Sequence, residues 1–477
     1  MSSVRPLRGR HVVAVSLGLP LGAGVFYLPR GVENLAGPVT PVAYLLGAFA
    51  LCPLAAAYAV FLSSPLAERD GLVYAAVSRT WGSRRLGFLS TWPAVGAYVA
   101  LLALHVAALG RTLSTFVGVA PDSATATAAT LVVLGVVVAV HALGPSVAGR
   151  VQLGVVGLLT ATLVGMGIAG LTKFVPWNFA PLLPTPTLRQ RPLATLGAAA
   201  TAALFGFVGF DAGAAASAAT RDPRRTAPRA VFVGLLVAGA VATLAALITL
   251  GVIPWSRLLY APAPFANAAA SGLPVGAEAI LVPGVALATA GAAFATVWLP
   301  ARTIRGVADV VPGADRTTRP GVPDPALAVT GLLAAGVVAF DLVGYALYLA
   351  LAGIVLQYGA LAASALALPL VRPALYRRCS FRLPPAVLGT VGGLAVAVVA
   401  VALGRVFALD PVTSLGFSRW APLLPAVGDV LVRDPLSTVV PALLLWELVG
   451  VAVLAVAADY RADRGIEPPP LAAAYKE

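Results

Sequence analysis

The sequence predicts an all-α polytopic membrane protein with about twelve transmembrane helices. Of its 477 residues, 59% are hydrophobic and only 11% are charged, whereas about a quarter of the residues of a soluble domain carry charge. A helix needs about 20 mostly apolar residues to cross a bilayer, and runs of that length recur along the whole chain. This composition excludes a soluble globular protein and makes the lipid bilayer the expected environment.

The predicted helices follow from the apolar runs between polar segments. In chain order, the twelve spans lie near residues 12–35, 41–62, 86–110, 124–144, 148–171, 193–219, 229–251, 276–299, 325–340, 343–371, 386–408 and 436–458. Residues 1–11 and 459–477 are then terminal tails. The longest polar loop, about residues 300–324, is too short to fold as a domain of its own.

The positive charge of the chain indicates its orientation in the membrane. The net charge of +13 comes from short Arg clusters between apolar runs rather than from one basic surface, which argues against nucleic-acid binding. If the N-terminus is cytoplasmic, twenty-three of the 32 Lys and Arg residues fall on the cytoplasmic side and nine on the outer side. Because cytoplasmic loops are enriched in Lys and Arg, we expect both termini to be cytoplasmic in a multi-pass protein of the cell membrane.

Two of the predicted spans contain residues that interrupt a helix. The first span holds the run Gly18 to Pro29 (GLPLGAGVFYLP), and the sixth holds Leu204 to Gly213 (LFGFVGFDAG). Proline removes a backbone donor and glycine tolerates non-helical dihedrals, so each segment can unwind for a few residues within the membrane. Unwound backbone is tolerated there only beside a cavity or a polar ligand. Alternatively, these glycines serve close helix packing.

The positions of the two interruptions suggest an internal repeat. One interruption opens residues 12–172, which hold five spans, and the other opens residues 193–371, which hold the next five. Each half has an odd number of spans, so the second half enters the membrane from the opposite side. Interruptions at corresponding positions of two inverted halves are typical of secondary transporters. Residues 386–458 then supply two additional helices.

Three segments carry a resemblance to a known family. Gly22 to Phe26 with Pro29 resembles the Gly-(Ser/Ala)-Gly-(Ile/Val)-Phe-x-x-Pro signature of amino acid permeases of the amino acid-polyamine-organocation (APC) superfamily. Phe205 to Asp211 (FGFVGFD) is similar to their sixth-helix segment, and Asp222 to Arg229 (DPRRTAPR) to the loop that follows it. The resemblance implies a LeuT-like fold of five plus five inverted helices with two extra C-terminal helices. It also implies secondary transport of amino acids or related amines by alternating access, as symport or antiport.

The family motifs imply which residues form the site. Helix N-termini attract anions and helix C-termini attract cations, so a broken helix can hold both ends of a zwitterionic amino acid. The resemblance places the substrate at Pro20, Gly22, Ala23, Gly24, Phe205 and Val208. It places gating or support of the helix break at Gly206, Gly209 and Asp211. Two structural alternatives remain: Phe205 as an ordinary core aromatic, and Asp211 as a capping or helix-bridging residue at the unwound segment.

The coupling ion is left open between a proton and sodium. Some proton-coupled members of the superfamily carry a lysine in the fifth helix, but the stretch after Gln152 has none. Three acids near predicted membrane interfaces, Glu33, Asp341 and Glu447, are expected to be solvated or locally paired.

No enzyme, metal site or cofactor is predicted. The sequence holds no paired-carboxylate, serine–base or metal-ligand constellation at membrane depth, and its three histidines are isolated. Two other functions stay open: an ion channel, or a carrier of the same fold for an organic solute other than an amino acid.

Overall fold

The predicted fold class is confirmed by the computed structural model. It describes residues 6–25, 29–121, 123–258, 264–273, 281–314, 316, 321–408, 436–467 and 471. Within these ranges the chain forms helices and no strand, and ten of the helices are long and apolar enough to cross a membrane. The count of twelve stays a prediction, because the first span is divided into short pieces and Pro325–Ala339 is a shorter apolar helix.

The described helices have the following bounds. They are α1 (Gly9–Leu19), α2 (Pro29–Ala36), α3 (Thr40–Leu62), α4 (Leu72–Trp81), α5 (Arg84–Phe116), α6 (Ala124–Ala142), α7 (Pro145–Leu171), α8 (Pro186–Gln190), α9 (Pro192–Leu204), α10 (Ala212–Ala215), α11 (Pro223–Val252), α12 (Trp255–Leu258), α13 (Pro264–Ser271), α14 (Leu281–Gly306), α15 (Pro325–Ala339), α16 (Val343–Val371), α17 (Pro373–Arg377), α18 (Pro385–Ala408) and α21 (Leu436–Arg464).

Several helices extend beyond the predicted spans. The α5 helix continues to Phe116 instead of ending near residue 110, and α14 continues to Gly306 instead of residue 299. Likewise, α11 begins at Pro223 rather than near residue 229. The apolar run marks only the part of a helix that crosses the hydrocarbon core, whereas backbone hydrogen bonding continues into the polar ends.

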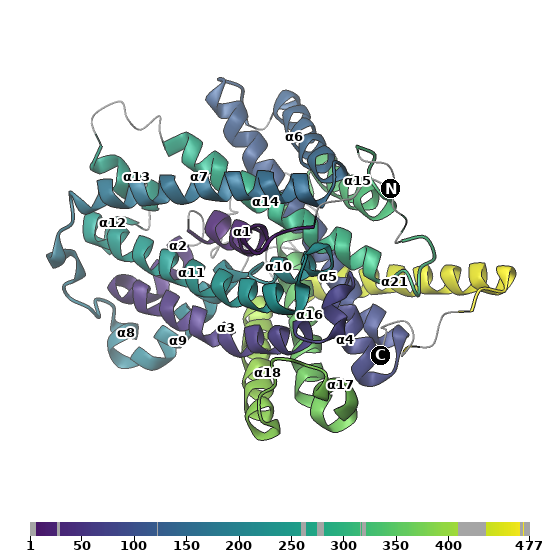
Figure 1. Ribbon diagram of the computed structural model, residues 1–477. Helices are drawn as coiled ribbons and strands as arrows, with labels where there is room; N and C mark the ends of the chain where they lie inside the picture. Colours follow the sequence, from purple (N-terminus) through teal and green to yellow (C-terminus); the bar gives the residue numbers. More distant parts are fainter. Residues whose placement is uncertain are drawn as a thin grey trace.

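The first helix, α1, lies in the middle of the bundle. It contacts α7, α11 and α14 (Figure 1), and nearly every residue from His11 to Leu19 is buried. Small residues permit this close approach: a Cβ at Gly18 would lie 2.7 Å from the carbonyl oxygen of Gly291 in α14. A helix that is apolar on all sides belongs in such a central position.

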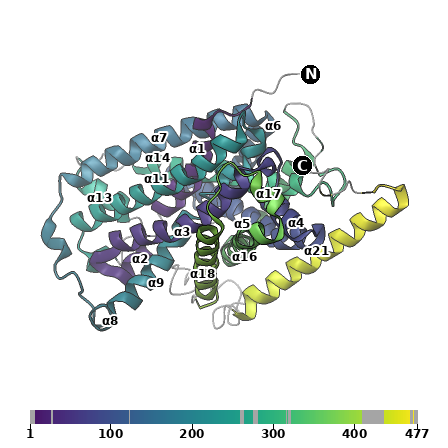
Figure 2. The same cartoon turned by 60° about the horizontal axis from the view of Figure 1, so that its bottom comes forward.

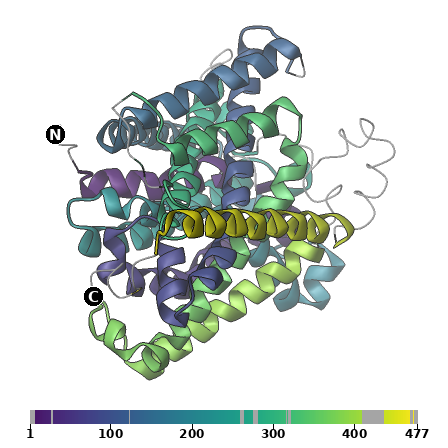
Figure 3. The ribbon, with the colours of Figure 1, turned by 90° about the vertical axis from the view of Figure 1, so that its right-hand side faces the viewer.

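The last helix, α21, lies at the edge of the bundle. Figures 2 and 3 show it running along the outside of the molecule. In the most apolar stretch of α21 only 17% of the residues are buried, compared with 83% in the corresponding stretch of α5. The α21 helix therefore presents its apolar side chains to lipid. It is attached to α5 by stacked indoles, since Trp92 and Trp446 have ring centroids 4.9 Å apart and each indole N–H donates to the other residue's carbonyl.

Candidate functional site

The first interruption is a widened helical turn rather than an unwound segment. The α1 helix ends at Leu19, and Pro20–Gly24 continues it as a π-helix. The expectation that this segment unwinds is therefore wrong within the part that the structure describes. Pro20 cannot donate the backbone hydrogen bond that an α-helix requires at its position, and a π-helical turn accommodates the defect without leaving the helical path. Residues 26–28, which include Phe26 of the signature, lie outside the described ranges.

The second interruption breaks the helix. The α9 helix ends at Leu204, a 3-10 turn covers Phe205–Phe207, and Val208 leaves the helical conformation with φ at −52° and ψ at 135°. Gly209 follows with φ at +92°, a left-handed conformation that favours glycine. A Cβ there would lie 2.0 Å from Cδ2 of Leu19. Gly209 therefore allows the sixth-span break to lie directly against the end of α1.

The two interruptions meet at the centre of the bundle, where the π-helical turn contacts the 3-10 turn. Pro20, Gly22, Phe205, Gly206 and Val208 are all buried there. Gly22 also faces α14, since a Cβ on it would lie 2.4 Å from the Ala288 carbonyl oxygen, so close helix packing is one use of this glycine. For Ala23 and Gly24 the structure describes only the backbone. Substrate binding at these residues stays a prediction.

Asp211 accepts hydrogen bonds from three tyrosines of three different helices. Tyr358 of α16 donates to Oδ1 at 2.7 Å, whereas Tyr58 of α3 and Tyr98 of α5 donate to Oδ2 at 2.8 and 3.3 Å. Asp211 is 2% exposed. Although it precedes α10, its side chain makes no capping hydrogen bond. The carboxylate thus links the sixth-span break to α3, α5 and α16.

The tyrosines were missed by sequence reasoning, although a signal exists. Tyr58, Tyr98 and Tyr358 all lie within predicted spans, and a buried phenol hydroxyl usually finds a hydrogen-bond partner. An intramembrane acid such as Asp211 was the natural acceptor to consider.

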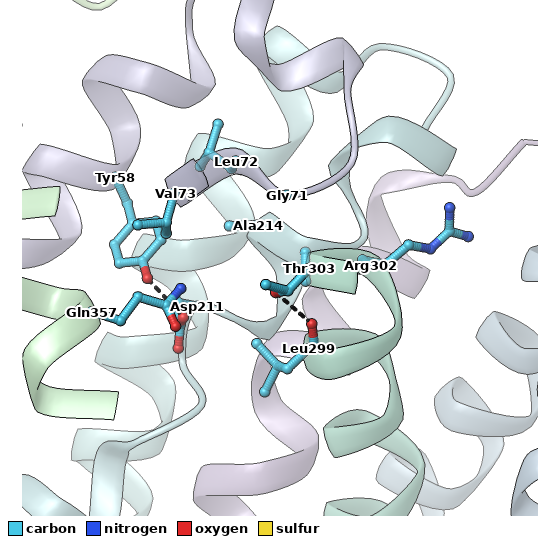
Figure 4. Close-up of a pocket in the computed structure, with 11 residues that line it drawn as sticks. Tyr58, Gly71, Leu72, Val73, Asp211, Ala214, Leu299, Arg302, Thr303 and Gln357 are labelled. Carbon is cyan, nitrogen blue, oxygen red and sulfur yellow. Dashed lines mark hydrogen bonds between the residues drawn. The ribbon is translucent and has the colours of Figure 1, made fainter. Parts of the chain in front are cut away.

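A small cavity lies beside Asp211. Its volume is about 20 Å³, and it lies between the start of α4 and the end of α14 (Figure 4). The lining residues are Tyr58, Gly71, Leu72, Val73, Asp211, Ala214, Ala215, Leu299, Arg302, Thr303 and Gln357. A cavity of this size holds about one water molecule. An amino acid does not fit in it.

Close backbone packing lies beside this cavity, between the start of α4 and the end of α14. Gly71, at φ +69°, meets Gly306 so closely that a Cβ on Gly306 would lie 2.4 Å from the Gly71 Cα. Ion pairs surround this contact: Asp70 pairs with Arg302 at 3.0 Å and with Arg305 at 3.1 Å. Arg305 also pairs with Asp324 at 2.7 Å. The loop before α4 is thereby fastened to the end of α14.

A neutral amide connects α1 to α14 in the buried core. Gln152 of α7 is fully buried, and its Nε2 donates to the Ala14 carbonyl at 3.2 Å and to the Gly291 carbonyl at 3.1 Å. The fifth predicted span thus contributes an uncharged hydrogen-bond donor between α1 and α14.

One expectation about the membrane-edge acids is wrong. Glu33 is neither solvated nor paired: it is 1% exposed, and neither carboxyl oxygen has a hydrogen-bond partner among the described residues. The α2 helix carries it inward against α9 and α3, a packing that the local sequence does not reveal. In contrast, Asp341 lies 3.7 Å from Arg111, so the predicted local pairing holds there. Glu447 is partly buried, and its Oε1 lacks a partner in the described part of the chain.

Together these features define a class: a polytopic helical membrane protein in which two interrupted helices meet beside a buried carboxylate. A model of the amino acid permease family matches residues 8–420, and the chain belongs to that family. The predicted APC-superfamily membership is thereby confirmed. Membership of this family points to a transporter rather than an enzyme.

Individual relatives are distant. The chain is 26% identical over 274 residues to the branched-chain amino acid permease BcaP of Lactococcus lactis subsp. cremoris, covering 54% of this chain and 58% of that protein. It is 25% identical over 448 residues to the methylthioribose transporter of Bacillus subtilis, covering 88% and 91%. The match to BcaP thus spans little more than half of each protein.

Proposed function

We propose that the protein is a secondary active transporter that moves amino acids or related amines across the cell membrane. Family membership over residues 8–420 supports this, as does the similarity to a branched-chain amino acid permease. The observation that carries the proposal is the contact between the two interrupted helices at the centre of the bundle, because irregular backbone at membrane depth is tolerated where it serves a binding site.

In this proposal the substrate binds along the two interruptions. The backbone around Gly22, Ala23 and Gly24 receives the carboxylate, because these small residues let a ligand approach the main chain closely. The carbonyl oxygens near Pro20, Phe205 and Val208 receive the ammonium group. The Phe205 ring covers the bound substrate.

Movement of the gate involves the sixth-span break. Gly206 and Gly209 let the backbone bend there, and Asp211 fixes the bent segment through its three tyrosine partners. An outward or inward movement of the break has to rearrange these hydrogen bonds.

Alternating access then follows from the predicted inverted halves, residues 12–172 and 193–371, with residues 386–458 as added helices. With cytoplasmic termini, the side sealed by Gly71 and Gly306 is the cytoplasmic side. The one-water cavity behind this contact supports a conformation closed on that side. We therefore expect the loop before α4 to separate from the end of α14 when substrate leaves toward the cytoplasm.

The test is counterflow in proteoliposomes, in which unlabelled substrate inside drives uptake of labelled substrate. A panel of amino acids and amines is expected to contain at least one exchanged substrate. Ala23→Leu is expected to abolish binding while the protein remains folded, because the added bulk occupies the substrate position. Ala128→Leu, on the exposed face of α6, is the matched control and should leave exchange unchanged. Normal binding by Ala23→Leu contradicts the backbone site, and absence of exchange across the panel contradicts amino acid transport.

A second substrate class is favoured by one comparison. The methylthioribose transporter of Bacillus subtilis covers 88% of this chain, so a related organic solute is the second candidate. Methylthioribose belongs in the same counterflow panel. Saturable exchange of methylthioribose without exchange of amino acids would select this candidate, whereas ion current without saturable exchange of any solute would indicate a channel.

A further inference from the structure

Glu33 is a carboxyl group placed where an unpaired charge is expensive. It lies in α2, the helical segment after the first interruption, and is 1% exposed. Neither of its oxygens has a hydrogen-bond partner within the described ranges. A carboxylate within the apolar part of a membrane protein normally pairs with a cation or faces water. Within the described part of the chain, Glu33 does neither.

Among the side chains that the structure describes, the helices packed around Glu33 supply no compensating charge. On α3, Tyr44 is 1% exposed, its hydroxyl has no partner among the described residues, and it would interact electrostatically with an ionised Glu33. The α9 helix holds no titratable residue between Pro192 and Leu204, and Arg257 of α12 is exposed. On α2 itself, Arg30 has a side chain outside the described part. A buried carboxylate without a partner cation is strongly disfavoured, so this closed arrangement accommodates Glu33 as the neutral acid.

Glu33 is also connected to the moving parts of the proposed mechanism. Tyr44 packs edge-on against Phe207 of the sixth-span break, with ring centroids 6.2 Å apart and an interplanar angle of 79°. The α2 helix, in turn, continues the first interruption and packs against α9. A movement at either interruption therefore changes the environment of the Glu33 carboxyl.

We propose that Glu33 carries the coupling proton of transport. Water that reaches the carboxylate from one side of the membrane supplies a proton, which forms the O–H bond before Glu33 is enclosed in its apolar surroundings. When the opposite side opens, this O–H bond breaks, the proton passes to water on that side and the carboxylate is hydrated. This inference rests on the proposed transport function and assigns a proton, rather than sodium, as the coupling ion.

The experiment compares two readouts in the same proteoliposomes: counterflow, which needs no ion gradient, and uptake driven by a pH gradient. With one proton per substrate, a gradient of one pH unit supports about tenfold accumulation. Glu33→Gln, which mimics the neutral acid, is expected to keep counterflow and to lose the gradient-driven accumulation. Glu447→Gln is the matched control, since Glu447 is an intramembrane carboxyl on the peripheral α21 helix, and should keep both readouts.

Each outcome is decisive. Accumulation by Glu33→Gln equal to that of the wild type overturns the assignment of the proton, as does wild-type accumulation that ignores the pH gradient while counterflow is normal. Absence of wild-type counterflow instead overturns the transport function itself. If Glu33→Gln does not fold, Glu33→Asp keeps an ionisable group in an altered position, and its pH profile of uptake must shift; an unchanged profile contradicts the proposal.

Discussion

The three hydrogen bonds on Asp211 lead to a prediction about two Tyr→Phe substitutions. Each substitution removes one tyrosine hydroxyl that donates to the Asp211 carboxylate. Tyr358→Phe removes the hydroxyl that donates to Oδ1 at 2.7 Å, which is the one side-chain donor to this oxygen among the described residues. Tyr98→Phe removes a longer bond of 3.3 Å to Oδ2, which keeps its 2.8 Å bond from Tyr58. We expect Tyr358→Phe to destabilise the protein more.

The expected free energies follow from what each substitution leaves behind. A hydrogen bond to a charged group contributes about 1.5–3 kcal/mol, and a buried acceptor left without a donor loses that contribution in full. Tyr358→Phe therefore should cost about 2–3 kcal/mol, with a further small loss because the hydroxyl also accepts from the Gly209 N–H at 3.5 Å. For Tyr98→Phe, a long bond to an oxygen that stays satisfied, the expected cost is about 0.5–1 kcal/mol.

Thermal unfolding of the detergent-purified variants is the assay, with Tyr460→Phe on the exposed side of α21 as a control. The expected order of melting temperature is wild type and Tyr460→Phe highest, then Tyr98→Phe, then Tyr358→Phe. A melting temperature of Tyr98→Phe equal to or below that of Tyr358→Phe would refute the reasoning, because Oδ1 would then not depend on Tyr358.

Two further predictions concern a glycine and a thiol. Gly209→Ala places a Cβ 2.0 Å from the Leu19 side chain at a φ of +92°, so we expect a loss of stability of about 1–3 kcal/mol. The control is Gly197→Ala in helix α9, where a Cβ meets open space; its stability should be unchanged or rise by up to about 1 kcal/mol. Equal melting temperatures of the two variants would contradict this prediction. Burial raises the pKa of the Cys379 thiol to about 12, so little thiolate exists near neutral pH. In a Cys52→Ser background, maleimide labelling of Cys379 should therefore be slow between pH 7 and 9 in the native protein and fast in SDS. Rapid labelling of the native protein at pH 7 would be inconsistent with this pKa.

The fold class and the two interruptions could be predicted because both depend on local composition. Apolar runs reveal the spans, and Gly and Pro mark where a helix cannot continue normally. The kind of interruption was less predictable. Pro20 permits either an unwound segment or a π-helical turn. The structure has the π-helical turn, in which Gly22 packs against α14. By contrast, Gly209 lies in a real break because its conformation is left-handed.

The polar partners could not be predicted, because they depend on contacts between distant segments. Asp211 was recognised as an unusual acid, but Tyr58, Tyr98 and Tyr358 come from three helices that only the folded bundle brings together. Glu33 was misjudged for the same reason. Its position near a span end favours solvent, and only the packing of α2 against α9 and α3 buries it.

The Gln152 bridge has a consequence for the electrical behaviour of the protein. If α1 swings away from α14 during transport, the side-chain amide has to release the carbonyl of Ala14 or that of Gly291. Because this amide is neutral, its release moves no net charge through the membrane field, whereas an elementary charge crossing it would gain or lose about 2.3 kcal/mol per 100 mV. The release of this bridge is therefore electrically silent.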